Sequence, residues 1–197
     1  MTVWFNAILD GVKTYLVFAP VAIIFVEILF ALKNKAFNPM RSIAIQMFIM
    51  YMFALVSVVF FPLPTPAQAA TLTYRIQPIP MYFVYDMITK PTISGILGVI
   101  FNFLLTIPFG MFLKYVLGLD FKGVFLATLG LTVFIEIAQF TGLFFFYQGS
   151  YRLCDMDDII LNTLGGLAGY KLSSLLDNVV PQLSEFAVSP VGQKKHA

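Results

Sequence analysis

Residues 136–169 read EIAQFTGLFFFYQGSYRLCDMDDIILNTLGGLAG, and they hold most of the acidic and amide side chains that lie within apolar sequence. Glu136 and Gln139 are spaced to share one face of a helix. After a polar turn, a second apolar run carries polar and small residues at intervals of three and four, namely Asp155, Asp158, Asn162, Gly165 and Gly169. These intervals predict one stripe along a second helix. Because such a stripe is unfavourable against lipid, we expect it to face protein or water.

The composition is that of an integral membrane protein. Of the 197 residues, 59% are hydrophobic and only 11% are charged, whereas a soluble domain is usually about 25% charged. The net charge of +2, without a basic patch before the C-terminal tail, argues against nucleic acid as a partner. The single cysteine, Cys154, excludes an internal disulfide. The N-terminus lacks a basic segment and a small-residue cleavage site, so we expect no cleaved signal peptide.

Five apolar segments are long enough to cross a bilayer, which takes roughly 17 to 25 helical residues. They are residues 15–32, 43–61, 93–117, 123–146 and 157–176. Residues 1–13 place polar side chains opposite an apolar face, which predicts an interfacial segment before the first span. We therefore predict an all-α fold, a polytopic membrane helix bundle with about five transmembrane helices plus an N-terminal interfacial segment.

Residues 61–91 differ from the spans, because they contain six of the eleven prolines. Proline removes a backbone donor and breaks helices, so we expect a long irregular loop. Its aromatic residues predict a position at the membrane interface. In the third span, Pro108 predicts a bend. We expect residues 1–176 to form a single transmembrane domain and residues 177–197 to form a polar cytoplasmic tail.

The basic residues are distributed unevenly between the two sides of the predicted bundle. One side has Lys33, Lys35, Arg41, Lys114, Lys122, Lys171, Lys194 and Lys195, and the other has Lys13, Arg75, Lys90 and Arg152. The positive-inside rule places the richer side in the cytoplasm. We therefore expect the N-terminus outside and the C-terminus in the cytoplasm. The loop 61–91 and the turn 147–158 are then both outside.

Glu136 is the candidate catalytic residue, since a carboxylate far inside an apolar helix favours a function. The alternative is a structural hydrogen bond to Asn102 or to Arg152. With about 1.5 Å of rise per helical residue, Glu136 is predicted to lie one turn deeper than Gln139, level with Gly165. The glycines there either allow two backbones to approach closely or leave room for a ligand.

The other polar residues also have two interpretations each. The amides of Gln139 and Asn162 are predicted to lie at similar depth and to bond across the interface between the last two spans. Asp155 and Asp158 have the spacing of a helix N-cap and its third residue, so a capping role is the alternative to a binding site. Cys154 is expected to be inert, because nothing in the nearby sequence marks it as activated.

The sequence gives little support to metal or triad chemistry. Asp157 and Asp158 are consecutive helical residues that point apart, so we predict no metal site and no cofactor. The only histidine, His196, lies in the tail, which excludes a Ser-His-Asp triad. Arg75 and Arg152, with Lys90, lie on one side and suit a phosphate or a carboxylate. Their alternative is to pair with the aspartates that follow Arg152.

This pattern resembles the VanZ-like family of bacterial membrane proteins. The matching positions are Glu136-x-x-Gln139, Arg152-x-x-Asp155-x-Asp157-Asp158, Asn162, Gly165, Gly169, and Asn102 with Pro108-Phe109-Gly110. Arg75 and Pro80 resemble the family's R-x-N-x-x-P-F loop, although Gln77 stands for its Asn and Met81 for its Phe. The resemblance covers about residues 45–176. It implies a multi-pass protein of the bacterial cell membrane, most often Gram-positive, and no established catalytic activity.

The family's named member is associated with low-level resistance to teicoplanin, a lipoglycopeptide. We favour a non-enzymatic binding protein with a polar cavity in the outer leaflet, whose partner is a membrane lipid headgroup, a lipid-linked cell-wall precursor or a lipoglycopeptide. The predicted ligand-binding residues are Arg75, Asn102, Glu136, Gln139, Arg152, Asp155, Asp158 and Asn162. The alternatives are an intramembrane enzyme on a phosphate-bearing lipid, with Glu136 as general base, and a small-molecule transporter subunit.

Overall fold

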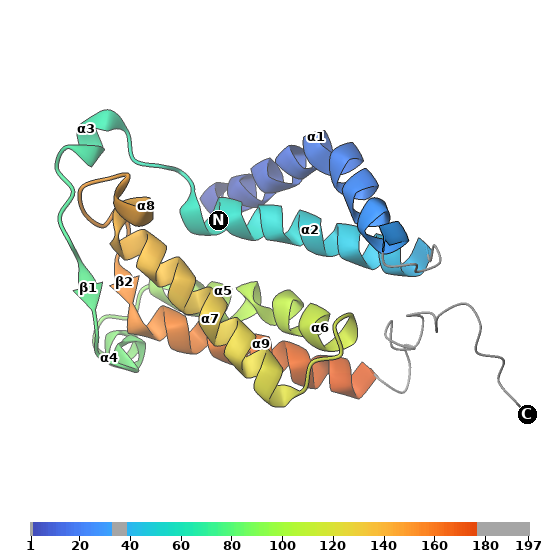
Figure 1. The fold of residues 1–197 in the computed structure, drawn as a ribbon. Helices are drawn as coiled ribbons and strands as arrows, with labels where there is room; N and C mark the ends of the chain where they lie inside the picture. The colour runs from blue at the N-terminus through green and yellow to red at the C-terminus, as the bar shows by residue number, and fades with distance from the viewer. Residues whose placement is uncertain (1, 33–38, 177–197) are drawn as a thin grey trace, which may run out of the picture.

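The computed structural model describes residues 2–32 and 39–176, and their regular structure is almost entirely helical (Figure 1). The longer helices are α1 (Thr2–Leu32), α2 (Pro39–Phe60), α5 (Ile93–Leu105), α6 (Ile107–Tyr115), α7 (Phe121–Phe140) and α9 (Met156–Leu176). The shorter elements are α3 (Pro66–Ala69), α4 (Tyr82–Thr89), α8 (Gly142–Phe145) and the strands β1 (Ile76–Gln77) and β2 (Cys154–Asp155). The prediction of an all-α helix bundle is confirmed.

Four stretches of the described residues are helical, long and apolar enough to cross a membrane. They are Phe5–Leu29, Ser42–Phe60, Ile93–Tyr115 and Phe121–Phe140. Helix α9 has 21 residues, but Asp157 and Asp158 lie in its first turn, and it does not meet the same criterion of apolarity. It lies against α5, α6 and α7 along most of the bundle (Figure 1). A fifth span formed by α9 therefore stays a prediction.

The predicted interfacial segment is not a separate element, which corrects the expectation for residues 1–13. Helix α1 runs without a break from Thr2, and it bends near its middle, where it contains Pro20 (Figure 1). Gly11 is buried against α2, and a Cβ at this position would lie 2.5 Å from the Cα of Ala54. Close helix packing thus joins this segment to the first span.

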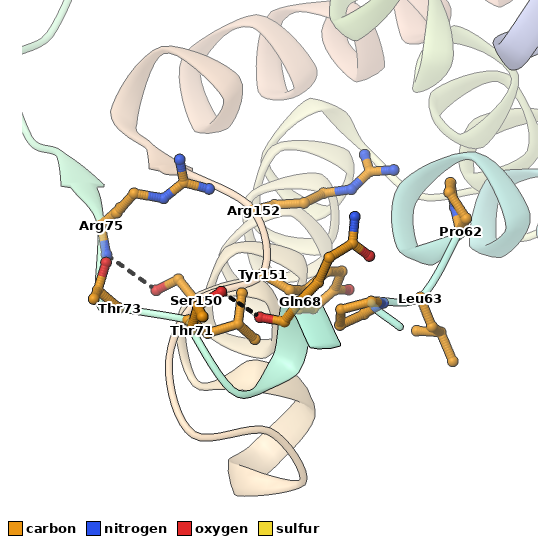
Figure 2. Close-up of a pocket in the computed structure, with 11 residues that line it drawn as sticks. Pro62, Leu63, Gln68, Thr71, Thr73, Arg75, Ser150, Tyr151 and Arg152 are labelled. Atoms are coloured by element: carbon orange, nitrogen blue, oxygen red, sulfur yellow. Dashed lines mark hydrogen bonds between the residues drawn. The ribbon is translucent and has the colours of Figure 1, made fainter. Parts of the chain in front are cut away.

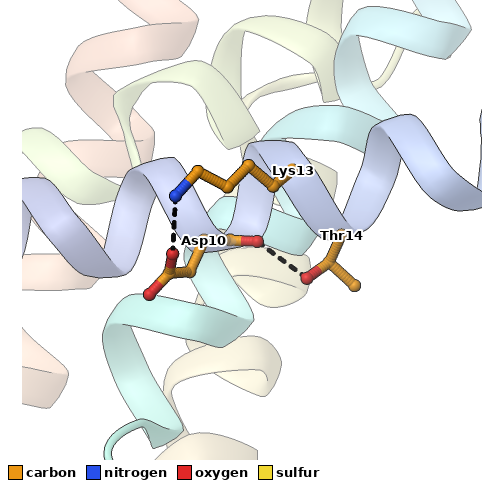
Figure 3. Close-up of polar contacts among 3 residues, drawn as sticks. All are labelled: Asp10, Lys13 and Thr14. Carbon is orange, nitrogen blue, oxygen red and sulfur yellow. Dashed lines mark hydrogen bonds and ion pairs between the residues drawn. The ribbon is translucent and has the colours of Figure 1, made fainter.

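The same part of α1 carries a local polar cluster (Figure 3). Lys13 Nζ lies 3.3 Å from Asp10 Oδ1, and the Thr14 hydroxyl donates to the Asp10 carbonyl over 2.7 Å. Both charged side chains are well exposed, so their ion pair contributes little to stability.

The third predicted span is interrupted, as Pro108 led us to expect. Helix α5 ends at Leu105, and α6 begins at Ile107 with Pro108 among its first residues. The break at Thr106 precedes the proline because Pro108 has no N–H to donate to the carbonyl of Leu104. Thr106 is fully buried, and its hydroxyl donates to the carbonyl of Asn162 in α9. The interruption thereby fastens α5 and α6 to α9.

The fourth span is shorter than predicted, because α7 ends at Phe140 rather than near residue 146. Gly142 has a positive φ of 63°, and the next residues are also left-handed. A Cβ at Gly142 would lie 2.5 Å from the carbonyl oxygen of Gly149, so the chain turns back here only with glycine. Glu136 consequently lies about one turn before the end of α7, closer to the end of this helix than predicted, and its depth in the membrane stays a prediction.

Residues 61–91 and 141–155 meet at one end of the bundle, which we call the loop end (Figure 1). The region predicted to be irregular contains α3, β1 and α4, and β1 pairs in parallel with β2. Arg152 Nη2 donates to the carbonyl of Phe61 over 2.9 Å, and Arg75 N donates to Ser150 Oγ over 3.3 Å. The long loop is therefore an ordered cap that positions two arginines.

The glycines of α9 serve close helix packing. A Cβ at Gly165 would overlap the carbonyl oxygen of Phe103, and one at Gly169 would overlap that of Ile107. The backbone of α9 thus runs against the backbones of α5 and α6, as in other small-residue interfaces between membrane helices. Of the two roles expected for this stripe, the described structure supports packing. The tail predicted for residues 177–197 lies outside the described residues.

Candidate functional site

Glu136 is sheltered inside the protein at the loop end. Its side chain is only 3% exposed, and Oε2 accepts the backbone N–H of Asp155 over 2.9 Å. The acceptor lies one turn before the end of α7 and the donor in β2, just before α9 begins. The two predicted structural partners, Asn102 and Arg152, do not make this bond. Glu136 is therefore sheltered from lipid, and its hydrogen bond joins two segments of the chain.

The predicted bond between the amides of Gln139 and Asn162 is not formed. Gln139 Nε2 instead donates to the carbonyl of Val59 over 3.0 Å, so the buried amide connects α7 to α2. Asn162 is also buried, and its Oδ1 has no partner among the described residues. The early end of α7 explains why the two amides do not meet. It places Gln139 close to the loop end, whereas Asn162 lies further along α9.

Asp155 connects three segments at the loop end. Its Oδ1 accepts the backbone N–H of Asp157 over 2.9 Å, which caps the first turn of α9. The same oxygen accepts Nε2 of Gln77 in β1 over 3.1 Å. Gln77 was not among the predicted site residues, because it replaces the Asn that the family resemblance led us to expect. Its position two residues after Arg75 was the signal in the sequence.

Asp157 and Asp158 hold α4 and α5 against the first turn of α9. Asp157 Oδ2 accepts the backbone N–H of Phe83 in α4 over 2.7 Å, and Asp158 Oδ1 accepts the amide of Asn102 in α5. Asp157 is 4% exposed, and sequence reasoning missed its role. Consecutive helical residues point apart, which excluded a shared metal ion in the prediction but suits two different partners.

Burial changes the proton affinities of this segment. Burial raises the pKa of the Asp155 carboxyl above its ordinary value, hydrogen bonds to it oppose this, and the charge of Asp157 adds to it. Burial also raises the pKa of the Cys154 thiol to about 11, and the neighbouring Glu136 carboxylate adds to the effect. Since the thiolate is the reactive form, Cys154 is largely unreactive at neutral pH.

A cavity of about 530 Å³, which we call the arginine cavity, opens between the loop 61–75 and the segment before β2 (Figure 2). Its polar lining comes from Gln68, Thr71, Thr73, Arg75, Ser150, Tyr151 and Arg152. Figure 2 shows Arg75 and Arg152 extending from two separate segments along the same side of this cavity. Two guanidinium groups at one cavity favour an anion.

The two arginines differ in how tightly they are held. Arg75 is exposed, whereas Arg152 is partly buried and hydrogen-bonded to Phe61. Burial lowers the pKa of the Arg152 guanidinium, and the charges of Tyr151, Asp158 and Glu136 oppose this change. Neither guanidinium has an ion-pair partner among the described residues. The alternative in which they pair with the following aspartates is therefore not realised.

A second cavity of about 570 Å³, the aspartate cavity, lies between α4, α5 and the start of α9. Its charged and amide lining consists of Asp86, Lys90, Asn102, Asp155, Asp157 and Asp158. The predicted site residues thus divide between two cavities of opposite charge. Glu136, Gln139 and Asn162 line neither of these two cavities. In the described part of the chain, no group of three or more His, Cys, Asp or Glu is placed to hold a metal ion.

No curated protein and no solved structure matches this chain. The family model described as VanZ/LLP1 matches residues 48–177, which include both cavities and all the residues that join α7, α9 and the loop end. This match covers well over half of the sequence and agrees with the motifs of α7 and α9. The chain belongs to the VanZ-like family of membrane proteins.

Proposed function

We propose that this protein binds a phosphate-bearing headgroup in the arginine cavity, on the outer side of the bacterial cell membrane, and thereby contributes to lipoglycopeptide resistance. The headgroup belongs to a membrane lipid or to a lipid-linked cell-wall precursor. Membership of the VanZ-like family indicates a membrane protein linked to glycopeptide resistance. The distribution of Lys and Arg supports an external loop end under the positive-inside rule.

The observation that carries this proposal is the pair of guanidinium groups at one cavity. Arg75 and Arg152 both line it, and neither is neutralised by an ion pair among the described residues. Thr71, Thr73 and Ser150 add side-chain hydroxyls to the same lining. Guanidinium groups bind phosphate oxygens through two parallel hydrogen bonds, and hydroxyl donors complete such a site.

The surroundings favour a ligand that arrives from the lipid. The prolines at 62 and 64 and the side chain of Leu63 form an apolar edge to the cavity, directly after α2. Leu63 is 38% exposed, and Phe61 before it is 48% exposed. A headgroup in the cavity can therefore leave its apolar chain beside the end of the second span. This combination suits an amphiphile better than a soluble anion.

The geometry gives less support to catalysis. Glu136, the candidate general base, is buried behind Asp155 and lines neither of the two cavities. A general base must come within hydrogen-bond reach of the proton that it removes. Glu136 is better placed to position Asp155, and through it Gln77 and the start of α9. We accordingly retain a binding function rather than an enzymatic one.

Native mass spectrometry of the purified full-length protein in detergent tests this proposal. Phosphatidic acid should be retained in preference to diacylglycerol, which has the same chains without phosphate. Arg75→Gln and Arg152→Gln should each weaken retention about tenfold, the effect of losing one hydrogen bond to a charged group. Lys122→Gln, an exposed cation at the start of α7, is the matched control and should behave as the wild type.

Teicoplanin and a lipid-linked pyrophosphate serve as further probes in the same measurement. Binding of teicoplanin that depends on Arg75 and Arg152 would assign the cavity to the antibiotic rather than to a lipid. Equal retention of phosphatidic acid and diacylglycerol, or unchanged retention in both arginine variants, would contradict the proposal.

A further inference from the structure

The aspartate cavity carries a strong excess of acidic side chains. Asp86, Asp155, Asp157 and Asp158 line it, and Lys90 is the one basic residue in the same lining. Four carboxyl groups around one cavity repel one another unless a cation or a proton lies between them. The arginine cavity has the opposite character, so the two cavities differ in the ligand that each can hold.

Asp157, in this acidic lining, has one carboxylate oxygen without a hydrogen-bond partner in the described part of the chain. Its side chain is only 4% exposed, and Oδ2 is satisfied by the N–H of Phe83. Its other oxygen, Oδ1, is buried and has no hydrogen-bond partner among the described residues. Buried carboxylate oxygens are nearly always hydrogen-bonded, because an unpaired one loses its hydration without compensation. A ligand with N–H donors would supply the missing partner.

The chemistry of the lining favours an ammonium group over a metal ion. Asp155 Oδ1 and Asp158 Oδ1 already accept hydrogen bonds from Gln77 and Asn102. Within the described chain, no three His, Cys, Asp or Glu residues converge as a metal site requires. An ammonium group has three donors and accepts a looser arrangement of oxygens. The nearby rings of Tyr82 and Phe83 also suit a cation.

One wall of the cavity is apolar and continues onto the lipid-facing side of α5. Ile96, Val99 and Leu161 belong to the lining. Along α5, Ile93, Ile96 and Ile100 are 79%, 41% and 46% exposed, and their spacing places them on one helix face. A charged group in the cavity can therefore be attached to an apolar chain that follows this face.

We infer that the aspartate cavity binds a primary ammonium group carried on an apolar stem. Asp157 Oδ1 accepts one of its N–H donors, and the stem lies along Ile96 and its neighbours on α5. This inference goes beyond the proposed function, because it concerns a separate cavity with a ligand of the opposite charge. It does not depend on Arg75 or Arg152.

Lys90 provides an alternative occupant that the test has to separate. This lysine is exposed, lines the same cavity, and has no ion-pair partner among the described residues. If an external ammonium group binds, Lys90 competes with it. Lys90→Met should then strengthen binding, whereas a cavity built for Lys90 alone would gain no external amine.

The test compares phosphatidylethanolamine with phosphatidylcholine on the purified full-length protein, by native mass spectrometry. The two lipids have the same net charge, but only the former has ammonium N–H donors. Phosphatidylethanolamine should be retained about tenfold better, the difference that a hydrogen bond to a charged group provides. Asp157→Asn, which keeps an acceptor for Phe83, and the exposed Asp86→Asn should each remove most of this preference.

Asp120→Asn is the matched control, since Asn still caps α7 at the other end of the bundle. Arg75→Gln should retain the preference, so failure here is distinguishable from failure of the proposed anion site. Competition by n-butylamine would extend the ligand class to soluble amines, and its failure to compete would restrict the class to lipids; both results support an ammonium site. Equal retention of the two lipids, full preference in both aspartate variants, or loss of binding in Lys90→Met would overturn the inference.

Discussion

The Glu136 carboxylate accepts the backbone N–H of Asp155 over 2.9 Å, and this bond joins the C-terminal part of α7 to the residue before α9. Asp155 in turn caps α9 and holds Gln77 of β1. The buried Glu136 carboxylate thus supports Asp155 in the wall of the aspartate cavity without lining this cavity itself. This arrangement gives the buried acidic side chain a hydrogen-bond partner among its apolar neighbours.

Replacing Glu136 tests its role as an acceptor. Glu136→Leu removes the acceptor and leaves the Asp155 N–H unpaired, so the free energy of unfolding should fall by about 1–3 kcal/mol. Glu136→Gln keeps an oxygen in the same place and should lose clearly less. Reversible unfolding in mixed micelles measures both. Equal losses for the two variants would show that the charge, rather than the acceptor, matters.

The reactivity of the Cys154 thiol depends on its burial and on the charge of the neighbouring Glu136 carboxylate. Burial raises the pKa of Cys154 to about 11, with a further contribution from Glu136. The rate of iodoacetamide alkylation should therefore keep increasing with pH beyond pH 9, because the thiolate is the reactive form. Removing the negative charge favours the thiolate, so Glu136→Gln should lower the pKa and speed alkylation at pH 9. Burial remains, so the pKa should stay above its ordinary value.

Cys154 is the only cysteine of the chain, so incorporation of one label measured by intact mass follows this site alone. The denatured protein provides the reference rate for an exposed thiol. An alkylation rate in the folded protein that levels off below pH 9 would contradict the burial of the Cys154 thiol. A rate that is the same with and without the Glu136 charge would contradict its closeness to Glu136.

Helix packing predicts opposite results at two glycines. A methyl group at Gly165 would overlap the carbonyl of Phe103 and lie 2.5 Å from Thr106 Oγ1, whereas Gly130 has nothing within 4 Å. Gly165→Ala should destabilise the protein by about 1–3 kcal/mol through overpacking. Gly130→Ala should be neutral or stabilise by up to about 1 kcal/mol, since alanine favours a helix. Unfolding in micelles compares them, and similar values for both would contradict the close approach of α9 to α5.

Antibiotic susceptibility connects the arginine cavity to the proposed function. In a susceptible Gram-positive host that expresses this protein, Arg75→Gln or Arg152→Gln should restore teicoplanin susceptibility, because each removes a guanidinium from the anion site. Lys122→Gln should keep any protection that the wild type gives. Minimum inhibitory concentrations at matched expression levels provide the measurement. Full protection in both arginine variants would separate the cavity from resistance.

Much of the fold followed from the sequence because the membrane restricts the possible structures. A spanning segment must satisfy its own backbone hydrogen bonds, so long apolar runs predict helices directly. The proline at 108 and the prolines of the loop 61–91 marked the break and the cap for the same reason. The end of α7 was missed, because residues 143–146 are as apolar as the helix and only Gly142 indicates the turn.

The candidate site could be predicted in its residues but less well in its geometry. Asp155 and Asp158 came from spacing alone, and the structure brings both to one cavity. The predicted pairing of Gln139 with Asn162 depended on equal helix lengths, and it failed when α7 ended six residues early. The partners of Gln77 and Asp157 are set by long-range contacts with the loop, which periodicity along one helix does not contain.

A double-mutant cycle on Arg75 and Arg152 tests the central claim most directly. The affinity of the purified protein for phosphatidic acid is measured for the wild type, Arg75→Gln, Arg152→Gln and the double variant. If both guanidinium groups bind one phosphate, their effects should be non-additive, with a coupling of at least about 0.5 kcal/mol. Strictly additive effects, or no loss of affinity in the double variant, would contradict a shared anion site between Arg75 and Arg152.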